Sequence, residues 1–232
     1  MQQQTIEYLQ SERYAKQKKK TLYDIATAME NLKSADAATR LKGAKRLSYH
    51  SRRELGWNCL PVREWFFDEK SRTELSALCR DEADDKVLRY LLSTLKFIYD
   101  RYVVHFTWKE LYAAEDETRY KKWVLSIVEE KFCTSVDVKV EVAGILSLCG
   151  DNRSWNTWNE VLAKKSAHCS WAQSIFAHHK NVSITDEQQS ALIQTLEKIN
   201  GKVKNPSVLK KAKKLKEIIE NWENPGTPRN AD

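Results

Sequence analysis

Four potential metal ligands lie close together in the chain, namely His168, Cys169, His178 and His179. Imidazole nitrogens and thiolates are zinc ligands, and a zinc ion holds them at about 2.0–2.3 Å. If all four lie on one helix, a rise of about 1.5 Å per residue places His168 and His179 roughly 16 Å apart. The short ligand spacings of zinc motifs are absent as well. The sequence therefore predicts no metal site here.

Covalent and phosphate chemistry has no sequence motif either. The chain lacks Gly-x-Ser-x-Gly, and its six glycines are too scattered to form a phosphate-binding loop. The cysteines are five in number, widely spaced and without a Cys-x-x-Cys pair: Cys59, Cys79, Cys133, Cys149 and Cys169. We interpret them as reduced, mostly buried thiols. We assign no catalytic residue, no metal and no cofactor, and the sequence favours a non-catalytic protein over an enzyme.

The composition is typical of a helical protein with an apolar core. Of the 232 residues, 41% are hydrophobic and 31% charged, with only six glycines and four prolines. An all-β chain needs more of these turn-forming residues. Apolar residues recur at helical spacing, for example over 22–32, 87–98 and 208–222. We predict an all-α fold, one domain over residues 1–222 and a disordered tail over 223–232.

Several helix boundaries can be predicted from capping residues. Asp36 can cap a helix that begins near Ala37, and Thr185 with Gln188 resembles a capping box. Asn205-Pro206 places proline at the first position of the last helix, where no N–H is lost. The run 136–142 alternates like a strand, but its apolar continuation favours a helix.

A nine-residue frame recurs along the chain, with a small or apolar sixth position and an apolar ninth. It begins at residues 39, 87, 138, 167 and 207. An aspartate precedes three of these frames: Asp36, Asp84 or Asp85, and Asp137. The pattern resembles the second helix of a HEAT repeat, most closely at Asp137-Val138-Lys139 to Ala143. The resemblance implies a short superhelix of antiparallel helix pairs. The alternative is an irregular helical bundle.

Basic residues are concentrated near both ends of the chain, whose net charge is +7. Residues 198–216 contain eight lysines and no acid. A curved solenoid would bring both basic ends to one ligand. The predicted binding residues are Arg40, Lys42, Lys45, Arg46, Arg89, Lys139, Trp155, Lys210, Lys213 and Lys214. For the lysine runs the sequence favours a solvated surface that keeps the protein soluble, and binding of an anionic ligand is the alternative.

Three tryptophans, Trp155, Trp158 and Trp171, allow two interpretations. They can form a stacking platform for bases or an anchor for a protein partner. They can equally belong to the core. The i, i+3 spacing of Trp155 and Trp158 fits a buried helical stripe, which favours the core.

The HEAT-like resemblance also implies one enzyme class. Some helical solenoids of this length are DNA glycosylases that act on alkylated bases, with an aspartate, tryptophans and an arginine in a basic groove. This chain has no tryptophan followed by aspartate at i+4. The nearest pair is Trp65 and Asp68 at i+3, and this departure weakens the assignment.

Two functions follow as hypotheses. The first is a non-catalytic module that binds a protein on the concave face of a solenoid, in one form an inhibitor or immunity protein for a toxin or enzyme. The alternative is a nucleic-acid-binding HEAT-like protein, in one form an alkylated-base DNA glycosylase. No apolar run approaches the roughly 18 residues needed to span a bilayer, and no secretory signal is evident. We therefore expect a cytoplasmic protein without membrane contact.

Overall fold

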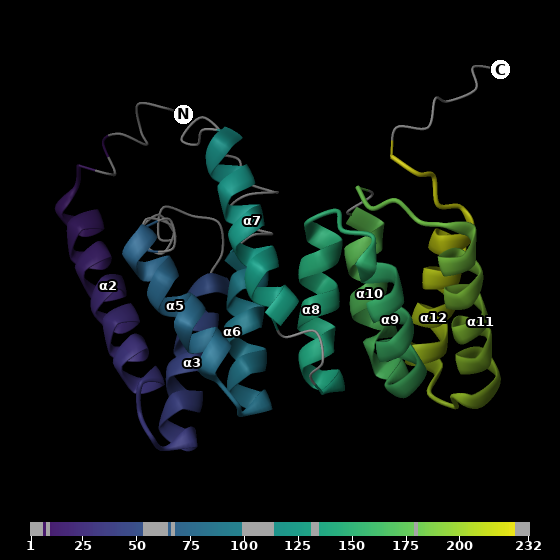
Figure 1. The fold of residues 1–232 in the computed structure, drawn as a ribbon, viewed down its shortest axis with the longest axis horizontal. Coiled ribbons are helices and arrows are strands. Elements are labelled where there is room, and N and C mark those ends of the chain that lie inside the picture. Colours follow the sequence, from purple (N-terminus) through teal and green to yellow (C-terminus); the bar gives the residue numbers. More distant parts are fainter. Residues whose placement is uncertain are drawn as a thin grey trace. The chain divides into compact units, whose positions relative to one another are not determined.

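A computed structural model describes residues 7, 10–52, 65, 68–98, 114–130, 135–178 and 181–225 (Figure 1). Every regular element in these residues is a helix, so the predicted all-α class is confirmed. The chain divides into two compact units, Met1–Lys131 and Phe132–Asp232. The single domain predicted over residues 1–222 stays a prediction, as does the superhelix.

The first unit is built from helix pairs. Its elements are α2 (Glu12–Leu32), α3 (Ala37–Arg52), α5 (Glu69–Asp81), α6 (Asp85–Ile98) and α7 (Ala114–Glu130). Short turns join α2 to α3 and α5 to α6, and α3 packs closely against both α2 and α6. The second helices of two successive pairs therefore lie side by side. Their contact buries Leu47, Leu91 and Leu95 completely.

The two second helices begin in the same way. The carboxylate of Asp36 accepts hydrogen bonds from the backbone N–H groups two and three residues later, at 3.3 and 2.9 Å. Asp84 makes the equivalent bonds at the start of α6, at 2.8 and 3.1 Å. Each aspartate thereby satisfies two N–H groups that have no partner within the helix. The cap predicted at Asp36 is confirmed.

The second unit contains a further series of packed helices. These are α8 (Val136–Leu148), α9 (Arg153–Lys164), the 3-10 turn η4 (Ser166–His168), α10 (Cys169–His178), α11 (Asp186–Lys202) and α12 (Pro206–Glu220). Helix α8 packs against α9, α9 against α11, and α12 against both α10 and α11. Gly150 ends the first of these helices with a φ of 70°, a conformation that favours glycine.

Helix α8 is buried around almost its whole circumference. Every residue from Val138 to Leu148 except Lys139 is buried or nearly so. A helix covered on all sides needs no polar face, so its sequence shows no clear helical periodicity. This burial explains the strand-like alternation over 136–142, and the predicted helix is confirmed.

The caps of the last two helices also agree with the sequence. Thr185 and Gln188 form a reciprocal capping box at the start of α11. The side chain of Asn205 accepts hydrogen bonds at the start of α12, where Pro206 is the first residue.

In the predicted tail, Asn224 hydrogen bonds to both backbone polar groups of Ile184, at 2.7 and 3.0 Å. Residues 226–232 lie outside the described residues.

An aromatic cluster forms the centre of the second unit. The rings of Trp155 and Phe176 stack at 4.3 Å, and Trp222 meets Trp155 edge-on at 4.9 Å. Trp155 and Trp158 are fully buried, and each indole N–H donates a hydrogen bond inside the protein. The core interpretation therefore holds for both. Trp171 is half-buried and packs against the edge of this core.

Candidate functional site

A groove of about 920 Å³ lies between α2 and α5 in the first unit. Helix α2 contributes Tyr23, Ala26 and Met29 to its lining, and α5 contributes Thr73 and Ala77. Tyr23 leaves 72% of its surface exposed, the largest exposure of any large hydrophobic side chain in the described part of the chain. The groove therefore offers an aromatic edge and small side chains to a ligand.

An ion-pair network at Lys33 links the two walls of this groove. The Lys33 ammonium contacts Glu30 of α2 and Glu74 of α5, each at 2.8 Å. Hydrogen bonds to these two carboxylates raise the pKa of Lys33 above its ordinary value. Lys70 adds a second cation to the lining, so the edge carries charges of both signs.

None of the groove residues was among the binding residues predicted from the sequence. Ala26 and Met29 belong to an apolar stripe whose helical spacing predicts burial in the core. Met29 is buried, but Ala26 is exposed. The available signal was the spacing of Tyr23, Ala26 and Glu30, which places a polar and aromatic strip beside the buried stripe. The position of α5 opposite that strip depends on long-range packing.

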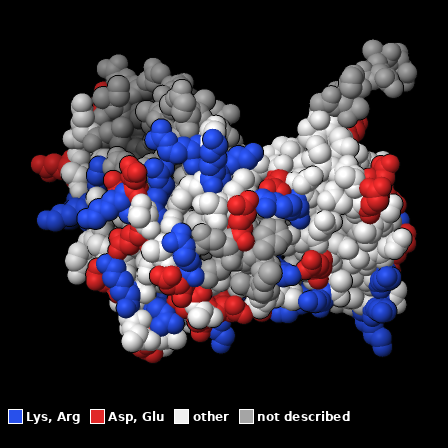
Figure 2. Space-filling model, in the orientation of Figure 1, with Lys and Arg blue, Asp and Glu red and all other residues white. Residues whose placement is uncertain are grey.

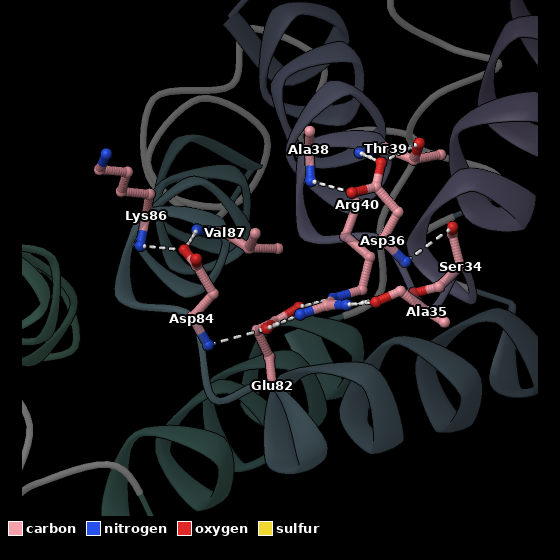
Figure 3. Close-up of polar contacts among 10 residues, drawn as sticks. All are labelled: Ser34, Ala35, Asp36, Ala38, Thr39, Arg40, Glu82, Asp84, Lys86 and Val87. Atoms are coloured by element: carbon pink, nitrogen blue, oxygen red, sulfur yellow. Dashed lines mark hydrogen bonds and ion pairs between the residues drawn. The ribbon is translucent and has the colours of Figure 1, made fainter.

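Arg40, a predicted binding residue, connects two inter-helix turns instead (Figure 3). Its Nε and Nη2 donate to the two carboxylate oxygens of Glu82 at 2.8 and 3.1 Å. Its Nη1 donates to the carbonyl oxygens of Ser34 and Ala35 at 3.2 and 2.9 Å. The hydrogen bonds with Glu82 raise the pKa of Arg40. All three guanidinium nitrogens therefore donate hydrogen bonds that connect parts of the fold.

The other predicted binding residues on α3, all cationic, differ in whether their charged groups contact other side chains of the unit. The Arg46 guanidinium forms an ion pair with Asp24 at 2.6 Å. The Lys45 ammonium lies 5.7 Å from the centre of the Tyr90 ring on α6. Lys42 is exposed. Helix packing thus uses two of these three charges for contacts within the unit.

Arg89 and Lys139, the next two predicted cations, lie in different units. Arg89 is half-buried on α6, and Lys139 on α8 forms an ion pair with Glu160 of α9. Asp137, in the closest HEAT-like frame, forms an ion pair with Lys165 at 2.6 Å.

Lys210, Lys213 and Lys214 are brought together on α12. All three are exposed, and their i, i+3 and i+4 spacing places them on one face of the helix. Figure 2 shows Lys and Arg atoms where α11 ends and the chain passes into the start of α12. We call these three residues the α12 lysine face.

Asp68, the carboxylate considered for base excision, caps helix α5. It accepts hydrogen bonds from the backbone N–H and the hydroxyl of Ser71, both at 2.9 Å. These bonds lower the pKa of Asp68. A carboxylate that caps a helix has a structural reason to be at this position, without any catalytic role.

We expect the stability difference between the wild type and Asp68→Asn to depend on pH. The lowered pKa of Asp68 means that its ionised form stabilises the fold above the unfolded pKa of about 3.9. This contribution disappears as the pH falls through the folded pKa. Asparagine also caps helices but does not titrate. Melting curves should therefore show a Tm difference of about 1–3 °C at pH 7 that decreases and then vanishes as the pH falls through the folded pKa of Asp68.

A difference in Tm that stays constant over this pH range would contradict the capping role of the Asp68 carboxylate. Base release from alkylated duplex DNA, measured on the same two proteins, separates the two interpretations further. A glycosylase that uses Asp68 as its carboxylate would lose activity in Asp68→Asn, whereas a cap would not affect the chemistry.

Metal ligands do not converge in the described parts of the chain, where no group of three or more His, Cys, Asp or Glu side chains surrounds a common point. Burial raises the pKa of the Cys169 thiol to about 11. A thiol with this pKa stays protonated at neutral pH and is a poor nucleophile and ligand. His179 lies outside the described residues.

The helices that are described include none long and apolar enough to cross a membrane.

Comparison with protein-family models, with curated proteins and with solved structures finds no match to this chain. The HEAT-like resemblance therefore rests on the repeated frame and on the equal capping of α3 and α6.

Proposed function

We propose that this chain is a non-catalytic protein-binding module, and that its α2–α5 groove receives an amphipathic helix of a partner protein. The observation that carries the proposal is the exposure of Tyr23, which leaves 72% of its surface uncovered at the edge of the groove. The groove lies within one unit, so the proposal does not depend on how the two units are arranged.

The chemistry of the groove suits a protein ligand. Tyrosine is enriched at protein interfaces because its ring contributes a large contact area and its hydroxyl can still form a hydrogen bond. Ala26 and Ala77 are exposed and small, which allows the backbone of a ligand to approach closely. Glu30 and Lys70 can pair with charges on the ligand. The groove therefore combines an anchor, space and polar edges.

A helix fits this groove better than an extended peptide does. Both walls are helices, whose interior backbone groups are already hydrogen bonded, so an extended peptide would find no strand edge to pair with. A helix satisfies its own backbone and needs only side-chain contacts. Residues 23–32 of α2 span about 14 Å, which matches two to three turns of a bound helix.

Site-specific photo-crosslinking tests this proposal directly. Tyr23 is replaced by a photoreactive benzoylphenylalanine, and the protein is irradiated in cells that naturally produce it. We expect one discrete protein adduct, with the crosslink mapping by mass spectrometry to an amphipathic helix of the partner. The same replacement at Tyr49, which is 53% exposed on α3, should not give this adduct because Tyr49 lies outside the groove.

A second pair of variants checks the site. Ala77→Arg places a long charged side chain in the groove and should lower the adduct yield at least about tenfold. Ala15→Arg, at an exposed position of α2 outside the groove, should leave the yield unchanged. No adduct from position 23, or equal yields from positions 23 and 49, would refute the proposal.

A further inference from the structure

We propose that the α12 lysine face, formed by Lys210, Lys213 and Lys214, binds the phosphate backbone of nucleic acid without reading its sequence. This face belongs to the unit Phe132–Asp232, whereas the α2–α5 groove belongs to Met1–Lys131. It is therefore a binding site in addition to the protein-binding groove.

The packing of α12 directs these three lysines to the solvent. On one side, the neighbouring Lys211 donates a hydrogen bond to Gln173 of α10 at 3.2 Å. On the other side, Lys216 forms an ion pair with Glu197 of α11 at 3.3 Å. The α12 lysine face lies between these two contacts and is exposed. Lys211 and Lys216 therefore contact neighbouring helices, whereas the three lysines of the α12 lysine face are exposed to solvent and can contact a ligand.

The available lysines are not neutralised within the described part of the second unit. Elsewhere in that unit, Lys139 and Lys165 pair with carboxylates. No ion pair joins the α12 lysine face to a carboxylate there. Residues 198–216 contain no acid, and the next acid along α12 is Glu217, which lines a pocket together with Lys214. Like charges at i, i+4 spacing repel one another, so this arrangement costs helix stability. An anionic ligand would relieve that repulsion.

The surroundings of the lysine face favour a phosphate backbone over other anions. Lysine ammoniums act as point charges that neutralise phosphates. The large hydrophobic side chains that are exposed in the described residues are Tyr23 and Tyr49, both in the other unit. The α12 lysine face itself carries no aromatic side chain, and Trp222, which lines a pocket together with Lys214, is half-buried against the core. These features favour the phosphate backbone of nucleic acid as the ligand.

The spacing of the lysines fits a regular polyanion. Lys210 and Lys214 are one helical turn apart, about 6 Å along the axis. Each strand of a DNA duplex carries one phosphate per 3.4 Å of helix axis, so ammoniums at this separation can meet nearby phosphates. Lys202 and Lys204, exposed at the connection that precedes α12, extend the positive surface.

The test uses the full chain and a fluorescein-labelled 20-base-pair duplex DNA, with binding followed by anisotropy at several salt concentrations. Three to four phosphate contacts predict a log–log slope of binding constant against salt of about −3. Combining Lys210→Gln, Lys213→Gln and Lys214→Gln should weaken binding at least about tenfold at 50 mM salt and bring the slope close to zero. Duplexes of unrelated sequence should bind equally.

The matched control removes the same charge from scattered positions. Lys86→Gln, Lys122→Gln and Lys164→Gln together lower the net charge by three at exposed sites on other helices, namely α6, α7 and α9. This triple variant should bind DNA nearly as tightly as the wild type. Tyr23→Ala should also bind DNA normally, so failure of the protein-binding proposal and failure of this one can be distinguished.

Several results would overturn the inference. No duplex binding at 50 mM salt would remove it, as would equal losses in the two triple variants. Tighter binding to vesicles containing phosphatidylserine than to DNA would identify a lipid surface instead. Tighter binding to poly-glutamate than to DNA would identify a site for an acidic protein. The wild-type binding and slope described above, lost only in the α12 variant, would support it.

Discussion

Replacing Trp155 by alanine is expected to destabilise the second unit by about 3–5 kcal/mol, the largest effect of any substitution considered. The indole is fully buried, stacks on Phe176 at 4.3 Å and meets Trp222 edge-on. Alanine would leave a cavity that the surrounding helices fill only in part. It would also remove the N–H that donates to the carbonyl oxygen of Ser183 at 2.8 Å.

Urea unfolding monitored by near-UV circular dichroism measures this loss, because the signal reports the packing of the aromatic cluster. Trp171→Ala is the control, since Trp171 is half-buried at the edge of the same core. Its cost should be less than half of that for Trp155→Ala. A loss below about 1 kcal/mol for Trp155→Ala would mean that the indole is not a core residue and would revive the surface interpretation.

Gly43→Ala is expected to destabilise the first unit by about 1–3 kcal/mol, even though alanine is the better helix former. Gly43 lies on α3 and faces α2 at close range. A Cβ atom there would lie 2.6 Å from the carbonyl oxygen of Ala28, with Asn31 and Leu32 at 3.1 Å. The nearest obstacle is backbone, so the two helices would have to move apart.

Gly201→Ala provides the matched control for this prediction. Gly201 also lies in a helix, near the end of α11, and a Cβ atom there would meet nothing within 4 Å. The same substitution should therefore stabilise the protein by about 0.5–1 kcal/mol through helix propensity alone. Denaturation curves of both variants measure the two changes in the free energy of unfolding. Stabilisation by Gly43→Ala would show that the helices are not in close contact.

The packing at Gly43 also has a functional consequence. Helix α2 presents one face to α3 and another to the groove, so its distance from α3 affects where Tyr23 and Met29 lie relative to α5. Moving α2 outward would alter the groove that we propose as the partner site. We therefore expect Gly43→Ala to lower the crosslinking yield from position 23, whereas Gly201→Ala should leave it unchanged.

Features that depend on neighbours in sequence could be predicted from the sequence. The caps at Asp36, Thr185 and Asn205 are made by hydrogen bonds that reach only two or three residues along the chain. Their residue types therefore predicted where α3, α11 and α12 begin. The exposure of the α12 lysine face follows similarly, because i, i+3, i+4 spacing opposes the apolar stripe.

Features that depend on distant neighbours were decided only by the tertiary structure. Arg40 was a predicted binding residue because of its charge, but the fold places Glu82 beside it, 42 residues later in the chain. The groove at Tyr23 exists because α5 stands opposite α2.

The sequence alone thus determined an all-α chain, its capped helix starts and its basic segment over 198–216. The tertiary structure decided which cations are paired, that the Trp155 indole lies inside the core, and where a groove remains open. The physical reason is the distance along the chain over which each kind of interaction acts. Capping and helical periodicity act within a few residues, whereas burial and ion pairing are set by the helices that pack together, which residue types do not specify.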